Sequence, residues 1–166
     1  MGAGHPESIA KVAERGHNLL LDQFASIEQI GERIAIFKRA VEVRGRRFDP
    51  MTVAVTRSVN VLMTAAEKEK AVETRMAARK RTERLAQRPD GQNKASIMSY
   101  AMTPESAEES ALYGTPDEVI AKLQTLEGLG ARYVLLNSAG GLQTLRRFAR
   151  EVMPVFSREP LLDAAG

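Results

Sequence analysis

Short runs of aliphatic and β-branched residues alternate along this chain with longer segments of helical periodicity. The runs are predicted to be strands, and they cover Asn18–Leu21, Thr52–Leu62 and Arg132–Leu136. Nearly continuous apolar runs are typical of parallel strands that are covered on both faces. Parallel strands joined by helical crossovers form either a doubly wound sheet or a barrel. The sequence therefore predicts an α/β domain.

The segments between these runs carry helix-start signals. Ser26 with Gln29, and Thr115 with Glu118, have the spacing of a capping box, in which each side chain bonds the backbone of the other residue. Pro6 suits a first helical position, where a missing N–H costs nothing. We expect helices over residues 6–15, 26–45, 64–89 and 115–130, and a last one whose inner face carries Leu142, Leu145, Phe148 and Val152.

The number of these units predicts part of a (β/α)8 barrel. The helical units outnumber the full strands, of which only three are expected in 166 residues, whereas a complete barrel has about 250 residues. We expect one partial barrel domain over residues 1–166. Within it, residues 90–113 are predicted to be an irregular insertion or lid, and residues 157–166 a surface tail.

The first residues have the composition of a phosphate-binding turn. Gly2 and Gly4 allow a ligand to approach the backbone closely, and His5 can cap the helix that begins at Pro6. The free N–H groups and positive dipole of that first turn favour an anion. Because such a turn normally follows a strand, we expect a functional site whose supporting half is missing.

Composition limits the kinds of site and partner. Without cysteine the chain forms no disulfide, thiolate metal site or cysteine nucleophile. Its two histidines show no HExxH-type spacing, so no metal site is predicted. No apolar run approaches the ~20 residues of a membrane span, and no signal peptide is recognisable. We therefore expect a cytoplasmic protein that does not bind membranes.

The net charge of +3 is concentrated in the basic stretch from Lys68 to Arg88. Glutamates at positions 69, 73 and 83 interrupt this stretch and Glu67 precedes it, which is typical of a solvated helix with i,i+4 pairs. We expect no nucleic-acid partner. A nucleic-acid-binding helix is the rival interpretation, and it predicts steeply salt-dependent binding.

Several segments, taken in order, resemble the carboxyl half of the bacterial luciferase-like flavin-dependent monooxygenases. They are Gly4–Ile9, Ala13–Gly16, Leu19–Asp22, Gly45–Pro50, Tyr113–Val119 and Tyr133–Asn137. The resemblance implies a (β/α)8 TIM barrel of which this chain holds about strands five to eight, the fifth reduced to its final residues. It also implies reduced FMN, dioxygen and a small organic substrate that is oxidised, or a deazaflavin in related members.

By this resemblance, the loop and helix start after the fifth strand hold the flavin phosphate. The residues implicated are the backbone of Gly4 and His5 and the hydroxyl of Ser8. An ordinary helix-start serine and a simple cap are the alternatives for Ser8 and His5. The turn Asn137–Gly141 is a second candidate, because barrels often bind phosphate after strands seven and eight.

Other polar residues lie where a substrate pocket would form. Asp22 and Gln23 follow a strand at the end where barrel active sites lie. Asn137, Gly140 and Gly141 follow a later strand and are also pocket candidates, and Arg57 interrupts the longest one. Whether Arg57 faces the barrel interior depends on register, because a one-residue slip reverses every side chain.

No catalytic residue is predicted, because no Ser-His-Asp set or pair of acids is apparent. This suits flavin chemistry, in which the cofactor carries the reaction. The alternative is a non-catalytic half-barrel with open sheet edges and an uncovered apolar interior. In either case we expect a homo-oligomer, or dependence on a missing amino-terminal half, in addition to flavin and substrate.

Overall fold

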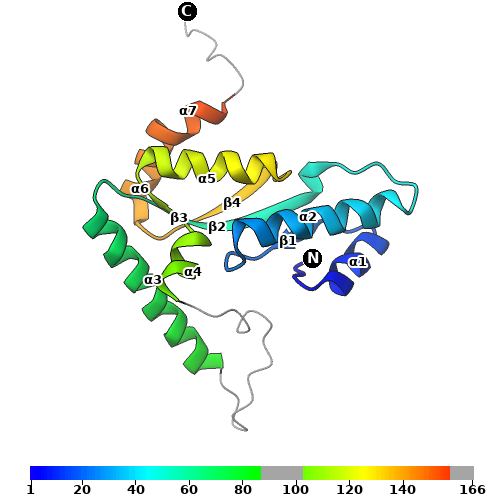
Figure 1. The fold of residues 1–166 in the computed structure, drawn as a ribbon, viewed down its shortest axis with the longest axis horizontal. Coiled ribbons are helices and arrows are strands. Elements are labelled where there is room, and N and C mark those ends of the chain that lie inside the picture. Colours follow the sequence, from blue (N-terminus) through cyan, green and yellow to red (C-terminus); the bar gives the residue numbers. More distant parts are fainter. Residues whose placement is uncertain (87–102, 158–166) are drawn as a thin grey trace, which may run out of the picture.

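The computed structural model describes residues 1–86 and 103–157, and its four strands form one parallel sheet (Figure 1). The strands are β1 (Leu19–Leu21), β2 (Val53–Val61), β3 (Leu112–Gly114) and β4 (Tyr133–Ser138). One edge of β2 pairs with β4 over residues 54–59. Its other edge pairs with β1 at its start and with β3 at its end. The predicted α/β class is confirmed.

The opening turn lies beside β1. Gly2 forms an isolated parallel bridge with Leu20. The Leu20 amide donates to the Met1 carbonyl at 2.8 Å, and the Ala3 amide donates to the Leu20 carbonyl at 3.4 Å. The turn therefore follows a short strand-like pairing of residues 1–3 with β1.

Helices connect the strands, and both predicted capping boxes are confirmed. Ser26 Oγ accepts from the Gln29 amide at 3.2 Å, and Thr115 Oγ1 accepts from the Glu118 amide at 3.4 Å. The elements are α1 (Pro6–Glu14), α2 (Ile27–Glu42), the 3-10 turn η1 (Pro50–Thr52), α3 (Ala65–Ala86), α4 (Pro104–Glu109), α5 (Pro116–Gly128), α6 (Gly141–Arg147), the π-helical turn η3 (Phe148–Val152) and α7 (Met153–Phe156).

The prediction of an irregular segment over residues 90–113 is wrong for its second part, which forms α4 and β3. Residues 90–102 and 158–166 lie outside the described part. The strand was missed because three residues carry no alternation, and pairing with β2 is what defines it. The helix was missed because its capping box ends in Ser106 and not in glutamate or glutamine.

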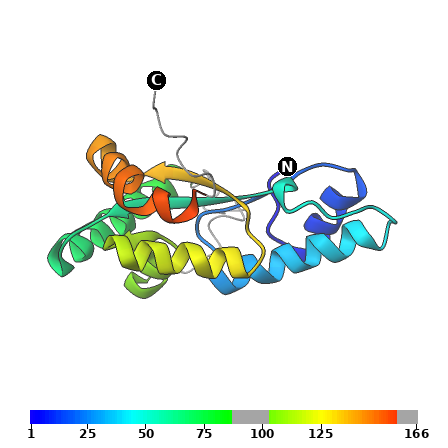
Figure 2. The same cartoon turned by 90° about the horizontal axis from the view of Figure 1, so that it is seen from above.

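The apolar core lies between one face of the sheet and the helices α2 and α5, which run along that side in Figure 2. Val53, Val55 and Val59 of β2 face this core and are fully buried. On the opposite face, Leu20, Tyr133 and Leu135 are 41%, 42% and 37% exposed. The prediction that the strands are covered on both faces is therefore wrong for this inner face.

The predicted inner face of the last helical segment is confirmed for Phe148 and Val152 and wrong for Leu142 and Leu145. Leu142 and Leu145 are exposed, whereas Thr144, Phe148 and Val152 are buried. Thr144, Phe148 and Val152 recur every four positions. Phe148 and Val152 lie in the π-helical turn, which is wider than an α-helix. None of the helices in the described ranges is long and apolar enough to span a membrane.

Candidate functional site

A cleft of about 540 Å³ opens where β2, β3 and β4 end. Its volume is in the usual range of small-molecule sites, ~300–1,000 Å³, and the carboxyl ends of parallel barrel strands are where barrel active sites form. The loop after β1 and helices α3 and α6 supply its walls (Figure 1). Residues from strands and loops include Gln23, Phe24, Ser58, Asn60, Tyr113, Asn137 and Gly140, and those from helices include Lys70, Arg75, Arg79, Thr144 and Arg147.

The strand register gives the cleft a polar inner end. Ser58 pairs with Asn137, and Asn60 pairs with Tyr113, so these side chains lie on the same face of the sheet. Ser58 Oγ and the Tyr113 hydroxyl are 3.1 Å apart, and both residues are buried. Hydroxyl and amide groups thus line the inner end of the cleft.

A second hydrogen-bonded group joins α6 to the end of β2. Thr144 Oγ1 donates to Asn60 Oδ1 at 2.8 Å and accepts from the Val61 amide at 2.8 Å. Gly140 packs against this pair so closely that a Cβ atom there would overlap Asn60 Oδ1 and lie 2.9 Å from Thr144 Oγ1. A glycine is therefore required at this point of the cleft for steric reasons.

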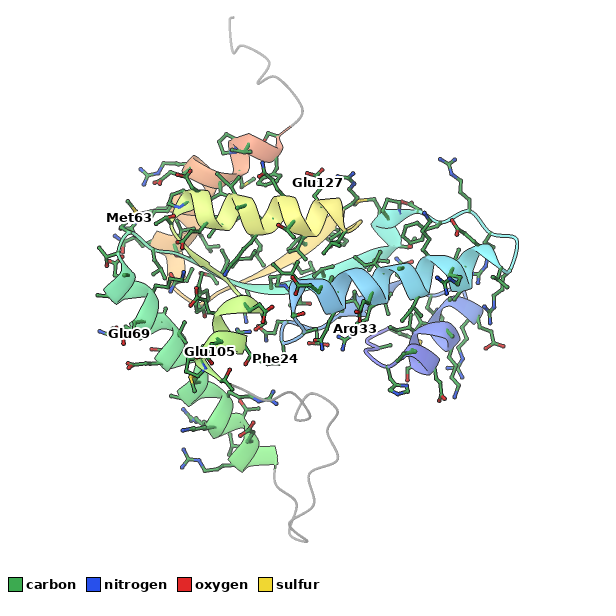
Figure 3. The ribbon with its side chains drawn as sticks, in the orientation of Figure 1. Phe24, Arg33, Met63, Glu69, Glu105 and Glu127 are labelled. Atoms are coloured by element: carbon green, nitrogen blue, oxygen red, sulfur yellow. The ribbon has the colours of Figure 1, made fainter. Side chains whose placement is uncertain are left out.

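Arg75 crosses from α3 to the loop after β1. One guanidinium nitrogen, Nη2, donates to the Gln23 carbonyl at 2.8 Å and to Ser110 Oγ at 3.3 Å. The guanidinium also lies 5.5 Å from the centre of the Phe24 ring and 5.9 Å from that of Tyr113. Figure 3 shows Phe24 near α4 and the start of α2. Burial lowers the pKa of Arg75 below its ordinary value.

The charge pattern of α3 predicts a solvated helix, but one of its faces is buried. Val72, Arg75 and Arg79 are buried on one face. The Arg79 guanidinium lies 4.8 Å from the centre of the Phe24 ring, and its Nε is 2.9 Å from Glu83 Oε1. The two inward arginines were missed because the many charges of this helix hide any apolar stripe.

The predicted pocket residues separate into two groups. Gln23, Asn137 and Gly140 line the cleft, whereas Asp22 and Gly141 do not. Gly141 begins α6 with a φ of +67°.

Asp22 organises its own loop: its carboxylate is 2.9 Å from Arg33 Nη1 and accepts from the backbone amides of Phe24 and Ala25.

Arg57 lies on the helix-covered face and not in the cleft, so its assignment to the substrate pocket is corrected. It shares a face with Val55 and Val59 and is 0% exposed. Its guanidinium donates to the carbonyls of Asp22 and Ala25 at 3.0 and 3.1 Å. Arg57 thereby holds the β1–α2 loop against β2.

The opening turn does not line the cleft. It lies on the other side of the β1–α2 loop. Ser8 is exposed in the first turn of α1, and the His5 side chain makes no capping hydrogen bond within the described ranges. A Cβ atom built on Gly4 would lie 3.5 Å from the guanidinium of Arg33, which is labelled on α2 in Figure 3. Sequence patterns gave no signal for this arginine.

The chain is similar to known proteins in sequence pattern and in fold. The model of the luciferase-like monooxygenase family matches residues 1–133. No match was found among curated proteins.

Three similar solved structures are RslO1, a monooxygenase from Streptomyces bottropensis; the oxygenating constituent of 3,6-diketocamphane monooxygenase from Pseudomonas putida, in complex with FMN; and the coenzyme F420-dependent tetrahydromethanopterin reductase from Methanopyrus kandleri. Their TM-scores are 0.66, 0.63 and 0.62, at 18%, 18% and 16% identity.

The similarity covers nearly all of this chain and half of each neighbour. It extends over 94%, 92% and 94% of this chain, but over 47%, 46% and 50% of those chains. The chain thus spans about half the length of the structures that it matches. With its parallel strands and covering helices, it is a partial TIM barrel.

Proposed function

The chain belongs to the luciferase-like monooxygenase family, and on this premise we propose that its cleft is part of a flavin-dependent oxidation site. The substrate is a small organic molecule, oxidised with dioxygen and reduced FMN. The observation that carries the proposal is the cleft itself, with a polar inner end at the carboxyl ends of parallel strands.

The turn at Gly4–Ser8 fits the phosphate of FMN. Helix α1 begins at Pro6 and presents its unpaired amides there, beside the exposed Ser8. Gly4 leaves the backbone open next to the Arg33 guanidinium, so an oxyanion at this turn meets both a cation and the positive end of a helix. We therefore assign the phosphate to Gly4, His5 and Ser8, and add Arg33.

The loop after β1 links this turn to the cleft. Asp22 holds Arg33 beside Gly4, and the next residue, Gln23, lines the cleft. A cofactor whose phosphate lies at the turn can therefore extend its ring system toward Asn60, Tyr113 and Asn137. When bound, reduced flavin supplies the electrons and activates dioxygen, and the residues of this chain bind, orient and exclude water.

A deazaflavin is the second candidate cofactor. It is favoured by the similarity to the coenzyme F420-dependent reductase, which is comparable to the similarity to the FMN complex. In that case the chain belongs to an oxidoreductase that does not use dioxygen. The two cofactors differ in their ring system, so their direct comparison decides between the candidates.

Spectroscopic titration of the purified chain tests the proposal, first alone and then with the amino-terminal half of a related monooxygenase. We expect FMN to bind more tightly than riboflavin, because the phosphate contacts the turn. Ser8→Ala should weaken FMN about tenfold, the effect of one charge-assisted hydrogen bond, and should leave riboflavin unchanged. The control is Ser157→Ala, which removes an exposed hydroxyl far along the chain.

The same titration with coenzyme F420 in place of FMN identifies the cofactor. If F420 binds more tightly than FMN, the proposed cofactor is the deazaflavin and not FMN. Failure of both cofactors to bind, with and without the amino-terminal half, contradicts the proposed function.

We also propose that the chain acts together with a second half-barrel. The exposed apolar residues Leu20, Tyr133 and Leu135 lie on the inner sheet face, and the matched structures are about twice as long. That second half is either another copy of this chain or a separate amino-terminal half.

A further inference from the structure

Arg75 is a buried cation without a carboxylate partner in the described ranges. It is 9% exposed, and no ion pair with it is found in residues 1–86 and 103–157. Within the same residues its Nε has no hydrogen-bond partner. Its hydrogen bonds are to neutral groups, among them the Gln23 carbonyl and Ser110 Oγ.

A buried charge in this condition is costly. Removing a guanidinium from water is unfavourable unless a counter-charge and hydrogen bonds replace its hydration. The rings of Phe24 and Tyr113 offset part of that cost through cation–π contact, but they supply no negative charge. Arg75 also lines the cleft, so a ligand there is in a position to provide the missing charge.

The charged residues of the cleft lining are predominantly basic. Besides Arg75 and Arg79, Lys70 and Arg147 contribute to it, against one acid, Glu67. Glu67 is engaged at the start of α3, where Oε2 accepts from the Met63 and Thr64 amides at 2.7 and 3.3 Å. Cations that line a concave, partly apolar surface raise the local concentration of anions.

Arg147 differs from the ion-paired Arg79. Its Nη1 donates to the Val61 carbonyl at 3.4 Å, which is a weak hydrogen bond. It comes from α6, while Arg75 comes from α3, so the two guanidinium groups enter the cleft from different elements. The planar fork of an arginine matches an oxyanion through two parallel hydrogen bonds.

We propose that the cleft binds a small organic oxyanion, such as a carboxylate, through Arg75, with Arg147 and Lys70 as further cationic contacts. Calling this oxyanion a group of the substrate rests on the proposed flavin function. The binding of an oxyanion by the cleft does not rest on it. The Tyr113 hydroxyl and the Asn60 amide are neutral groups that orient the rest of the ligand.

A flavin phosphate is the other source of an oxyanion. We assign that phosphate to the turn at Gly4–Ser8, which is not part of the cleft lining. The two sources are distinguished by comparing FMN with riboflavin, since only FMN carries the phosphate.

Calorimetric titration of the full chain with benzoate and with benzamide tests the proposal, because the two probes have nearly the same shape and differ in charge. We expect benzoate to bind at least tenfold more tightly, which corresponds to about 1.4 kcal/mol. Arg75→Met should abolish this preference, and Arg147→Met should reduce it severalfold. Lys80→Met is the control, because Lys80 is exposed on the same helix and does not line the cleft.

Arg75→Lys provides a variant that keeps the positive charge and loses the fork, and we expect it to retain part of the preference. Equal binding of benzoate and benzamide to the wild type overturns the proposal. So does an unchanged preference in both Arg147→Met and Arg75→Lys. If Arg75→Met instead abolishes the preference for FMN over riboflavin, the cleft holds the cofactor phosphate and the assignment to substrate is overturned.

The outcome for the flavin is separate from the outcome for the oxyanion. Binding of benzoate with the expected arginine dependence, but of neither FMN nor F420, contradicts the proposed function and leaves the oxyanion site intact. Binding of FMN without any preference for benzoate does the reverse.

Discussion

Arg57 and Arg75 are both buried arginines, and their surroundings give them different roles. Arg57 donates to backbone carbonyls of the β1–α2 loop on the helix-covered face. Arg75 lies between two aromatic rings at the cleft. Arg57 is buried against the β1–α2 loop, and its guanidinium does not face the cleft. Arg75 places a cation at the wall of the cleft. Only Arg75 is therefore suited to bind a ligand.

Gly140 is a position where one methyl group decides the shape of the cleft. We predict that Gly140→Ala destabilises the protein by about 1–3 kcal/mol, the usual cost of overpacking. The new Cβ atom must displace Asn60 or Thr144, whose hydrogen bond joins β2 to α6. Urea unfolding measures the change in the free energy of unfolding.

The matched control for this prediction is Gly128→Ala at the end of α5, where nothing lies within 4 Å of the new Cβ atom. Because alanine is the better helix former, this variant should be neutral or slightly stabilised. Equal effects of the two substitutions would show that Gly140 is not in close contact with Asn60 and Thr144.

Among the elements, α3, α4 and α5 are joined by one lysine. Lys68 Nζ is 2.6 Å from Glu108 Oε1 and 3.0 Å from Glu118 Oε1. The hydrogen bond to Glu108, followed by that to Glu118, raises the pKa of Lys68. Glu118 accepts from the Thr115 amide and then from Lys68, and these bonds lower its pKa. These ion pairs therefore join α3, the helix that carries Arg75, to α4 and α5.

We predict that Glu118→Gln destabilises the protein near neutral pH by about 0.5 kcal/mol, because the ion pair is partly exposed. A carboxyl group whose pKa is lowered on folding stabilises the folded state above its ordinary pKa of 4.5, and this contribution is lost as the pH falls through the lowered pKa. The difference between wild type and variant should therefore shrink on acidification below pH 4.5.

Urea unfolding at a series of pH values measures this difference. For Lys68 the sign is opposite, because its pKa is raised: its contribution is complete below the ordinary pKa and declines as the pH rises through the raised value. Asp117→Asn removes a carboxylate from the same helix turn without removing this ion pair, and we expect it to have a smaller effect. A pH-independent difference for Glu118→Gln would contradict the ionic link.

At the scale of the whole molecule, the main feature is the inner face of the sheet, which the described helices leave partly exposed. Leu135 and Tyr133 are partly exposed there on β4, and contiguous exposed apolar surface marks an interaction site. Sheet edges left without a partner add to the same tendency. A half-barrel of this kind is expected to pair with another half-barrel.

We predict that the isolated chain sediments as a dimer or a larger species and that Leu135→Glu shifts it toward monomer. The added charge makes burial of the inner face costly. Val43→Glu is the control, because Val43 is 79% exposed at the end of α2, away from that face. Urea unfolding of the same variants establishes that the fold is retained. A stable monomeric wild type would contradict this prediction.

Local signals in the sequence were sufficient for much of the fold. The capping boxes at Ser26 and Thr115 and the apolar runs of β1, β2 and β4 identify most elements, because caps and short-range periodicity depend on neighbours within a few residues. The order of several short motifs, from Gly4–Ile9 to Tyr133–Asn137, was sufficient for the family. The same signals placed Gln23, Asn137 and Gly140 at strand ends, which the structure brings into one cleft.

Tertiary structure decided the rest. The direction of Arg57 follows from the strand register, which has a period of two and is defined only by the neighbouring strands. The strand Leu112–Gly114 exists through its pairing with β2, and Arg75 turns inward because Phe24 and Tyr113, from distant parts of the chain, receive it. These features depend on contacts between residues far apart in sequence, which no local pattern records.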